Sequence, residues 1–159
     1  MRIGLGRDLH RLVTGRRLVL GGLEIPFDKG EAGHSDGDAL THAIIDALLG
    51  AAGLGDIGEL FPSDDERWKD ADSIALLKIA DGKVREARWR IINIDCVVSC
   101  ERPRLLPYRE ALRARLAEAL GIECGRVFVK AKTGEGLGDI GVGAAVEAVA
   151  VCLLERAQS

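Results

Sequence analysis

The chain has 159 residues, of which 47% are hydrophobic and 30% are charged, and this composition is typical of one globular domain with a substantial core. Its net charge is only −3 and aromatic residues make up 4%, which argues against a nucleic-acid-binding surface, since such a surface is normally basic. No apolar run is as long as a membrane span, which needs about 20 residues. We therefore expect residues 1–159 to form a single domain with neither nucleic acid nor membrane as a partner.

The N-terminal half predicts two strands, a helix, a loop and a second helix. Residues 1–6 predict a short strand, and residues 17–25 predict another after a turn at Gly15. Residues 38–52 predict a helix, because apolar side chains recur at helical spacing and Gly53 follows as a stop signal. Residues 62–72 are polar and predict an exposed loop. Residues 73–86 predict a helix, which is weakened by a glycine at position 82.

The C-terminal half predicts a strand, a helix and a further strand, and leaves one segment open. Residues 92–100 alternate between apolar and polar side chains, with Ile92 on the apolar face, which is typical of a strand with one buried face. Pro107 suits the first turn of a helix that Gly121 ends. Residues 127–131 predict a strand. Residues 142–154 are ambiguous, because their alanines favour a helix and their valines favour a strand.

All three histidines lie in or next to two aspartate-containing segments near the N-terminus. Asp8 and His10 are two residues apart, so both side chains point to one face of a strand, and we expect them at the end of the first strand. The segment His-Ser-Asp-Gly-Asp occupies residues 34–38, and His42 follows four residues later. One carboxylate and two imidazoles form a three-ligand set that suits zinc and leaves a fourth position open. The same set also suits iron(II) or manganese.

Polar residues around His42 predict a supporting shell. Ser35 and Asp38 have the spacing of a helix-capping box. Asp38, His42 and Asp46 recur every four residues, so we expect Asp38 and Asp46 to orient His42 through hydrogen bonds. Each histidine alone would more commonly be a surface or core residue, and an Asp-x-His sequence often occurs by chance. The two segments together favour a metal site.

Two other features of the sequence indicate the cellular compartment and exclude a dinucleotide-binding site. Four cysteines form no Cys-x-x-Cys pair and predict small buried side chains in a reducing cytoplasm. Charged residues follow Met1 closely, so we expect no secretory signal.

The sequence Gly-Leu-Gly-Asp-Ile-Gly occurs at residues 53–58 and 136–141 and fits G-x-G-x-x-G both times. Neither copy has the strand–helix–strand context of a dinucleotide site, so we exclude one.

Ten short blocks follow one another from Met1 to about Glu155. They are Arg2-Ile3-Gly4, Asp8-x-His10, Gly21-Gly22 with Ile25-Pro26, His34-Ser35-Asp36-Gly37-Asp38 with His42-Ala43, Asp46-Ala47-Leu48-Leu49-Gly50, Leu54-Gly55-Asp56-Ile57-Gly58, Phe61-Pro62, Asp72-Ser73, Pro103 with Leu106-Pro107, and Lys130-Ala131 with Thr133 and Glu135. In this order the chain resembles the 2-C-methyl-D-erythritol 2,4-cyclodiphosphate synthases of the non-mevalonate isoprenoid pathway. The resemblance implies an α+β fold, with a four-stranded mixed sheet and helices packed on one face, and residues 142–154 as a strand. It also implies a homotrimer with active sites between subunits.

The resemblance implies a phosphorus–oxygen lyase reaction. The 2-phosphate of 4-diphosphocytidyl-2-C-methyl-D-erythritol 2-phosphate attacks the β-phosphorus of its own diphosphate and releases CMP. Such an intramolecular transfer needs positioning and charge neutralisation more than covalent chemistry. In the family, zinc binds the positions of Asp8, His10 and His42, and a magnesium or manganese ion that bridges the diphosphate binds the position of Glu135.

The resemblance also assigns the remaining site residues. His34 and Thr133 correspond to the groups that stabilise charge in the transition state. Residues expected to contact the methylerythritol end, including a mobile lid, are Ser35, Asp56, Ile57, Gly58, Phe61, Pro62, Ser63, Asp64 and Asp65. Residues expected to form the cytidine pocket are Cys100, Pro103, Arg104, Leu105, Leu106, Ala131 and Lys132.

Five positions depart from the family pattern. Arg104 replaces a lysine, which keeps charge but changes geometry, and Lys132 stands where threonine is common. Asp139, Val142 and Ala144 replace an aromatic residue, an arginine and a glutamate near the trimer axis. We therefore expect no ligand site on that axis that depends on the arginine.

Two other functions use the same residues. The first is a metal-stabilised trimer that binds nucleotide or isoprenoid ligands without turnover, and the intact catalytic and metal positions argue against it. The second is a metal phosphohydrolase that admits water to the site. The sequence distinguishes a phosphohydrolase poorly from a cyclase, because the difference is whether the lid excludes water from the site.

Overall fold

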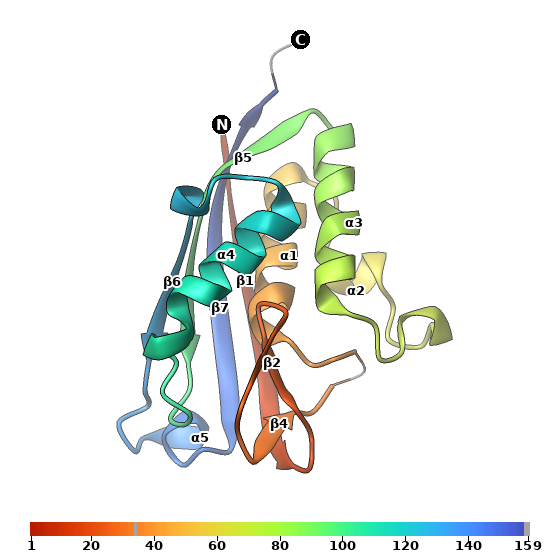
Figure 1. Cartoon of the computed structure of the whole chain (residues 1–159). Helices are drawn as coiled ribbons and strands as arrows, with labels where there is room; N and C mark the ends of the chain where they lie inside the picture. The colour runs from red at the N-terminus through yellow and green to blue at the C-terminus, as the bar shows by residue number, and fades with distance from the viewer. Residues whose placement is uncertain (34, 158–159) are drawn as a thin grey trace.

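A mixed five-stranded β-sheet forms one layer of the protein, and helices pack against one of its faces (Figure 1). The computed structural model describes residues 1–33 and 35–157. The strand order is β4-β1-β7-β5-β6; β5 and β6 are parallel, and the other neighbours are antiparallel. A small second sheet pairs β2 with β3. The strands are β1 (Arg2–Thr14), β2 (Leu18–Leu20), β3 (Leu23–Ile25), β4 (Lys29–Glu31), β5 (Trp89–Ser99), β6 (Val127–Lys132) and β7 (Ala145–Arg156).

Three helices of 12 to 14 residues form the second layer, and short helical turns connect the elements. The long helices are α1 (Ala39–Ala52), α3 (Ser73–Glu86) and α4 (Arg109–Leu120). The short elements are α2 (Ile57–Leu60), η1 (Glu66–Trp68), η2 (Leu106–Tyr108), η3 (Cys124–Arg126) and α5 (Gly138–Gly141). The α+β class and the three long helices predicted from the sequence are confirmed. The short helices α2 and α5 were not predicted, because each follows a glycine-rich stretch that reads as a loop.

Helix α1 lies directly against the backbone of β1. A Cβ atom at Gly4 would lie 1.9 Å from the carbonyl oxygen of Ala47, and one at Gly6 would lie 2.0 Å from that of Ala43. Glycine is therefore required at both positions for this close approach. The Asp38 side chain caps the start of the helix by accepting from Thr41 N, and Gly53, with a φ of 74°, ends it in the left-handed conformation.

The first strand is longer than predicted. The expectation of a short strand over residues 1–6 is wrong, because β1 continues to Thr14 and pairs with β7 along most of its length. Asp8 and His10 therefore lie in the middle of β1 rather than at its end. The charged residues after Gly6 conceal the strand pattern, since only the alternate side chains that face α1 are buried.

The prediction of a four-stranded sheet is wrong, because β4 adds a fifth strand at the edge. It has only three residues and pairs with Leu12–Thr14, so no apolar alternation reveals it. The single strand predicted over residues 17–25 is also wrong. Gly21 and Gly22 have φ values of 56° and 68°, and they turn this segment into the β2–β3 hairpin.

The strand predicted over residues 92–100 and the ambiguous segment 142–154 both become long strands. The predicted register of β5 is wrong at its start, because an irregularity between Ile91 and Asn93 buries Ile91 instead of Ile92. The segment 142–154 lies mostly in β7, the central strand, which pairs with both β1 and β5. Tertiary pairing therefore decides between the helix and strand preferences of its residues. The strand predicted over residues 127–131 is confirmed as β6.

The face of the sheet opposite the helices carries exposed apolar side chains. Ile3, Leu5 and Leu9 project from β1 and are 74%, 68% and 49% exposed, and Phe128 and Val151 of β6 and β7 are also exposed. The alternate residues of β1 face α1, so these side chains share the other face. Several exposed apolar side chains on one face of a sheet are typical of an interaction surface.

All four cysteines are free thiols. Cys96, Cys100 and Cys152 are buried, as predicted, and burial raises the pKa of the Cys96 thiol to about 12. Cys124 is exposed, so the prediction of a buried side chain is wrong at this position. Within residues 1–33 and 35–157, the helices lack the combination of length and apolar character needed to cross a membrane.

We expect Gly6→Ala to lower the free energy of unfolding by about 1–3 kcal/mol, because the new methyl group overpacks the contact with α1. Gly82→Ala is the matched control, since its Cβ would meet nothing within 4 Å. Removing this mid-helix glycine should raise the free energy of unfolding by up to about 1 kcal/mol. Urea denaturation measures both values, and an undiminished stability of Gly6→Ala would contradict the role of the close approach.

Candidate metal centre and active site

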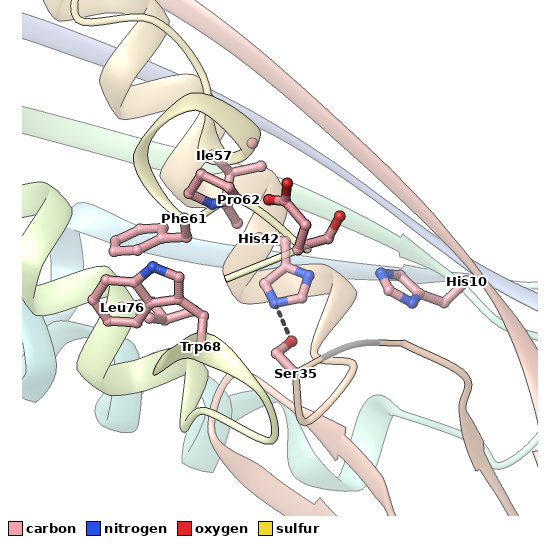
Figure 2. A pocket seen from close by; sticks show the side chains of 11 residues that line it. His10, Ser35, His42, Ile57, Phe61, Pro62, Trp68 and Leu76 are labelled. Carbon is pink, nitrogen blue, oxygen red and sulfur yellow. Dashed lines mark hydrogen bonds between the residues drawn. The ribbon is translucent and has the colours of Figure 1, made fainter. Parts of the chain in front are cut away.

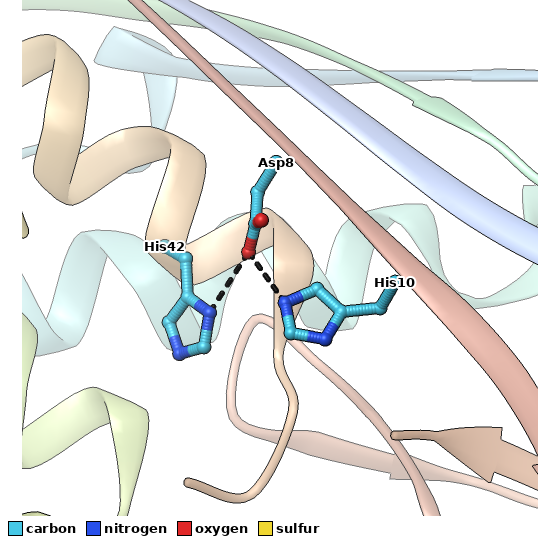
Figure 3. Close-up of side chains that lie close together, drawn as sticks. All are labelled: Asp8, His10 and His42. Carbon is cyan, nitrogen blue, oxygen red and sulfur yellow. Dashed lines mark hydrogen bonds and ion pairs between the residues drawn. The ribbon is translucent and has the colours of Figure 1, made fainter. Parts of the chain in front are cut away.

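Asp8, His10 and His42 converge between β1 and the first turn of α1 (Figure 3). The Asp8 Oδ2 atom lies 2.7 Å from His10 Nε2 and 2.9 Å from His42 Nδ1. Ligand atoms of the three residues lie within 4.8 Å of one another. The structure therefore brings together the three metal ligands predicted from the sequence. One carboxylate oxygen and two imidazole nitrogens are a donor set that zinc accepts with one position left open.

Hydrogen bonds on the far side of each imidazole leave the near nitrogen available for a metal. His10 Nδ1 lies 2.7 Å from the Ala32 carbonyl oxygen, which can only accept, so Nδ1 carries the proton. His42 Nε2 lies 2.9 Å from Ser73 Oγ and 3.1 Å from Ser35 Oγ. With a metal bound, a proton on His42 Nε2 would leave the Nδ1 lone pair free to ligate the ion. This arrangement fits a bound metal, because ligating histidines characteristically donate their other N–H to such partners.

Ser73 belongs to a longer chain of hydrogen bonds that orients His42. The Ser73 hydroxyl donates to Asp36 Oδ1, and the Ser73 backbone N–H donates to Asp36 Oδ2 at 2.9 Å. The hydroxyl oxygen is thereby free to accept from His42. Sequence reasoning missed this role of Ser73, because the residue lies 31 positions from His42. The available signal was the Asp72-Ser73 block at the start of α3, where Asp72 caps the helix.

The prediction that Asp38 and Asp46 orient His42 is wrong. Asp38 accepts from Gly21 N at 2.8 Å and Gly22 N at 2.7 Å, so it joins α1 to the β2–β3 hairpin. Asp46 instead accepts from Ile57 N at 2.8 Å and fastens the start of α2. The capping box predicted from Ser35 and Asp38 is also wrong, since Asp38 is itself the N-cap residue.

The electrostatics of the triad favour a cation. Burial opposes ionisation of Asp8, but hydrogen bonds from His10 and His42 outweigh it and hold the pKa of Asp8 well below its ordinary value. Burial likewise opposes protonation of His10, but the hydrogen bond and negative charge of Asp8 raise the pKa of His10. An ionised carboxylate therefore lies between two imidazoles, at a position where a positive charge is stabilised.

A cavity of about 570 Å³ opens beside the triad (Figure 2). Its lining residues are His10, Ser35, His42, Ile57, Gly58, Phe61, Pro62, Ser63, Asp64, Trp68 and Leu76. Several residues that the family resemblance assigned to the methylerythritol end therefore lie around one hollow. The predicted residues Asp56 and Asp65 do not line it. They cap α2 and η1 by accepting from Glu59 N at 2.8 Å and Arg67 N at 3.0 Å.

Trp68 and Leu76 form an apolar wall that sequence reasoning missed. Phe61 and Trp68 meet edge to face, with ring centroids 5.0 Å apart. In Figure 2 these two rings and Leu76 lie on the side of His42 away from His10. A tryptophan in the otherwise polar segment 62–72 was a usable signal. The cavity thus has a polar, metal-binding end and an apolar end, as is usual for a small-molecule site.

The segments predicted to bind cytidine form a second cluster, where the parallel strands β5 and β6 end. Cys100 N donates to the Lys132 carbonyl oxygen at 2.9 Å, and Gly134 N donates to Glu101 Oε2 at 3.0 Å. The segments 100–106 and 131–135, which these hydrogen bonds join, carry the predicted residues Cys100, Pro103, Arg104, Leu105, Leu106, Ala131, Lys132, Thr133 and Glu135.

The two clusters are separated within one chain. Strands β7 and β5 lie between β1 and β6. At about 4.8 Å per strand, the end of β6, which leads into Thr133 and Glu135, lies roughly 14 Å across the sheet from the triad. The structure of one chain therefore does not bring Thr133 or Glu135 to the triad. The predicted catalytic residue His34 lies outside the described residues.

We expect Ser73→Ala to weaken zinc binding by about 10- to 100-fold, which is the usual effect of removing a partner of a ligating histidine. The variant removes one of the two hydroxyls that contact His42 Nε2. Ser63→Ala is the matched control, because Ser63 lines the same cavity and should leave zinc affinity unchanged. Chelator competition measures both dissociation constants. Equal affinities of the two variants would contradict the orienting role of Ser73.

Comparisons with known proteins identify relatives along the whole chain. The family model described as the YgbB family matches residues 1–155. A curated 2-C-methyl-D-erythritol 2,4-cyclodiphosphate synthase from Treponema denticola is 58% identical over 154 residues, which cover 97% of this chain and 96% of that protein.

Solved structures agree with this relationship. A 2C-methyl-D-erythritol-2,4-cyclodiphosphate synthase in its CDP-bound form is 44% identical, with a TM-score of 0.90, and the match covers 97% of this chain and all of that chain. The bifunctional IspDF from Campylobacter jejuni is 42% identical, with a TM-score of 0.94. That match covers 98% of this chain but only 42% of the longer protein. The resemblance seen in the sequence is confirmed, and the chain belongs to the YgbB family.

Proposed function

We propose that this chain is a lyase that cyclises 4-diphosphocytidyl-2-C-methyl-D-erythritol 2-phosphate to 2-C-methyl-D-erythritol 2,4-cyclodiphosphate and releases CMP. The observation that carries this proposal is the convergence of Asp8, His10 and His42 beside a cavity of about 570 Å³. It occurs in a chain that is 58% identical to a curated cyclodiphosphate synthase. Metal-assisted intramolecular phosphoryl transfer is the chemistry that such a site can perform.

The metal-binding residues have distinct tasks. Asp8, His10 and His42 would hold zinc, which supplies a Lewis acid and a template for the β-phosphate. Glu135 would hold magnesium or manganese, which would neutralise negative charge on the diphosphate, and an exposed carboxylate suits this role. His34 and Thr133 would stabilise negative charge on the phosphates as the ring closes.

The remaining residues position the substrate. Asp56, Ile57, Gly58 and Ser35 would contact the methylerythritol end, and Phe61–Asp65 would close over it to exclude water. The segments Cys100–Leu106 and Ala131–Glu135 would bind cytidine, largely through backbone groups, with Arg104 and Lys132 adding positive charge near the phosphates. A relative solved with CDP bound supports a cytidine nucleotide as the ligand.

We also propose that three chains assemble around the exposed face of the sheet. The apolar side chains of Ile3, Leu5 and Leu9 give that face an interaction surface. A trimer would let the triad of one chain meet the second cluster of its neighbour, which the roughly 14 Å separation within one chain prevents.

The four free thiols suit a reducing compartment, so we propose that the enzyme is cytoplasmic.

Phosphorus NMR of purified protein with substrate and metal tests the reaction. A cyclic diphosphate together with CMP supports the proposal. Inorganic phosphate would instead indicate the phosphohydrolase, and unchanged substrate would indicate a binding protein without turnover. Either of these results would overturn the proposed cyclisation.

We expect Asp8→Asn and His42→Ala to lower the rate of CMP release at least about 100-fold, because each removes a ligand from the metal. Asp28→Asn, at an exposed position away from the cavity, is the control and should retain its activity. A chelator should abolish activity in the parent protein, and added zinc should restore it. Near-normal rates in folded Asp8→Asn would contradict the metal assignment.

We expect Leu5→Lys to dissociate the assembly, because three buried charges at the sheet face would carry a large desolvation penalty. Light scattering during size-exclusion chromatography should give threefold the 17.0 kDa chain mass for the parent protein and a smaller mass for the variant. Leu54→Lys, at an exposed leucine following α1, is the control. A monomeric parent protein would refute the trimer.

A further inference from the structure

The side-chain carboxyl group of Glu31 is fully buried beside the metal centre. Its side chain is 0% exposed at the end of β4. Glu31 Oε2 accepts a hydrogen bond from Ala39 N, the first residue of α1, at 2.9 Å. The other oxygen, Oε1, is buried and has no hydrogen-bond partner in the described part of the chain. Glutamate is almost never fully buried unless it is paired, so this placement needs an explanation.

The placement is unfavourable by itself. Burial raises the pKa of Glu31 well above its ordinary value, and the negative charge of nearby Asp38 raises it further. Helix α1 also does not need a second cap, because Asp38 already accepts from Thr41 N. The two carboxyl groups make different connections, however. Asp38 joins the helix to the β2–β3 hairpin, whereas Glu31 joins it to the corner between β4 and β1.

That corner carries one of the metal ligands. The backbone of Glu31 pairs with Leu12 of β1, and Ala32 N donates to the Arg11 carbonyl oxygen at 2.8 Å. The Ala32 carbonyl oxygen in turn accepts from His10 Nδ1. Through its side chain, Glu31 thus connects the strand that holds His10 to the first turn of the helix that holds His42.

The loop that follows Glu31 packs on the Glu31 side chain and on the His10 imidazole. A Cβ atom at Gly37 would lie 2.9 Å from Glu31 Cβ, and one at Gly33 would lie 3.1 Å from His10 Cε1. The described residues of this loop include Ser35, whose hydroxyl contacts His42. Gly37 therefore packs closely on the Glu31 side chain, and Gly33 packs on the His10 imidazole.

We propose that Glu31 is a positioning residue that sets the separation of His10 and His42 by joining the β1–β4 corner to the start of α1. This inference rests on the proposed metal site and adds a residue that touches neither metal nor substrate. The reach of the side chain to Ala39 N is the property that matters. A residue of equal length that accepts a hydrogen bond should replace it, and a shorter one should not.

Two conservative variants distinguish the effect of side-chain length at position 31 from the effect of its charge. Glu31→Gln retains the length and an acceptor for Ala39 N, and we expect its zinc dissociation constant to stay within about twofold of the parent value. Glu31→Asp retains the carboxyl group but is shorter by one methylene. We expect its zinc affinity to fall about 10- to 100-fold, in the range seen when the partners that orient ligands are lost. Chelator competition on the apoprotein measures these constants without recourse to activity.

Cobalt(II) binding provides a second readout. The visible absorption of bound cobalt reports coordination geometry, so Glu31→Asp should show a weaker or shifted spectrum and Glu31→Gln the parent spectrum. Leu116→Ala, on the buried face of α4, is the control for a general loss of stability and should keep parent zinc affinity. Parent-like affinity in Glu31→Asp would overturn the positioning role, as would a loss in Glu31→Gln or in Leu116→Ala as large as the loss in Glu31→Asp. A parent protein that binds no zinc would instead refute the metal site itself.

Discussion

The contact between α1 and β1 determines the geometry of the candidate site. Two glycines in the strand let the helix backbone approach so closely that no side chain fits between them. The first turn of the helix then places His42 against Asp8, and the strand pleat places His10 on the same face. The metal ligands therefore come from rigid, mutually buried elements, which limits their movement more than loop positions would.

Partners from distant segments then fix each imidazole. A backbone carbonyl after β4 orients His10, and hydroxyls from the loop before α1 and from the start of α3 orient His42. With a net charge of only −3 and a phosphate-rich substrate, the proposed reaction needs positive charge from bound metals and from directed N–H groups. The hydrogen-bond network prepares the lone pairs that such metals require.

The sequence predicted those features that depend on local patterns. Asp38 and Gly53 mark the ends of α1, and the spacing of Asp8, His10 and His42 indicated the triad. It could not predict contacts that only tertiary packing creates. Strand β4 has three residues and no apolar alternation, Ser73 meets His42 from another helix, and an irregularity in β5 changes which isoleucine is buried. Family resemblance supplied the second cluster, which no local pattern reveals.

The central position of β7 has a consequence for folding order. Strand β1, which carries two of the three metal ligands, pairs Arg2 with Leu154, so its main partner is synthesised long after it. In a nascent chain, residues 2–11 of β1 lack their β7 partners until β7 leaves the ribosome, and the long loop that closes makes this pairing slow. Metal capture by a partly made chain would therefore lack a completed sheet to support it, and the binding site should mature only after translation of the domain ends.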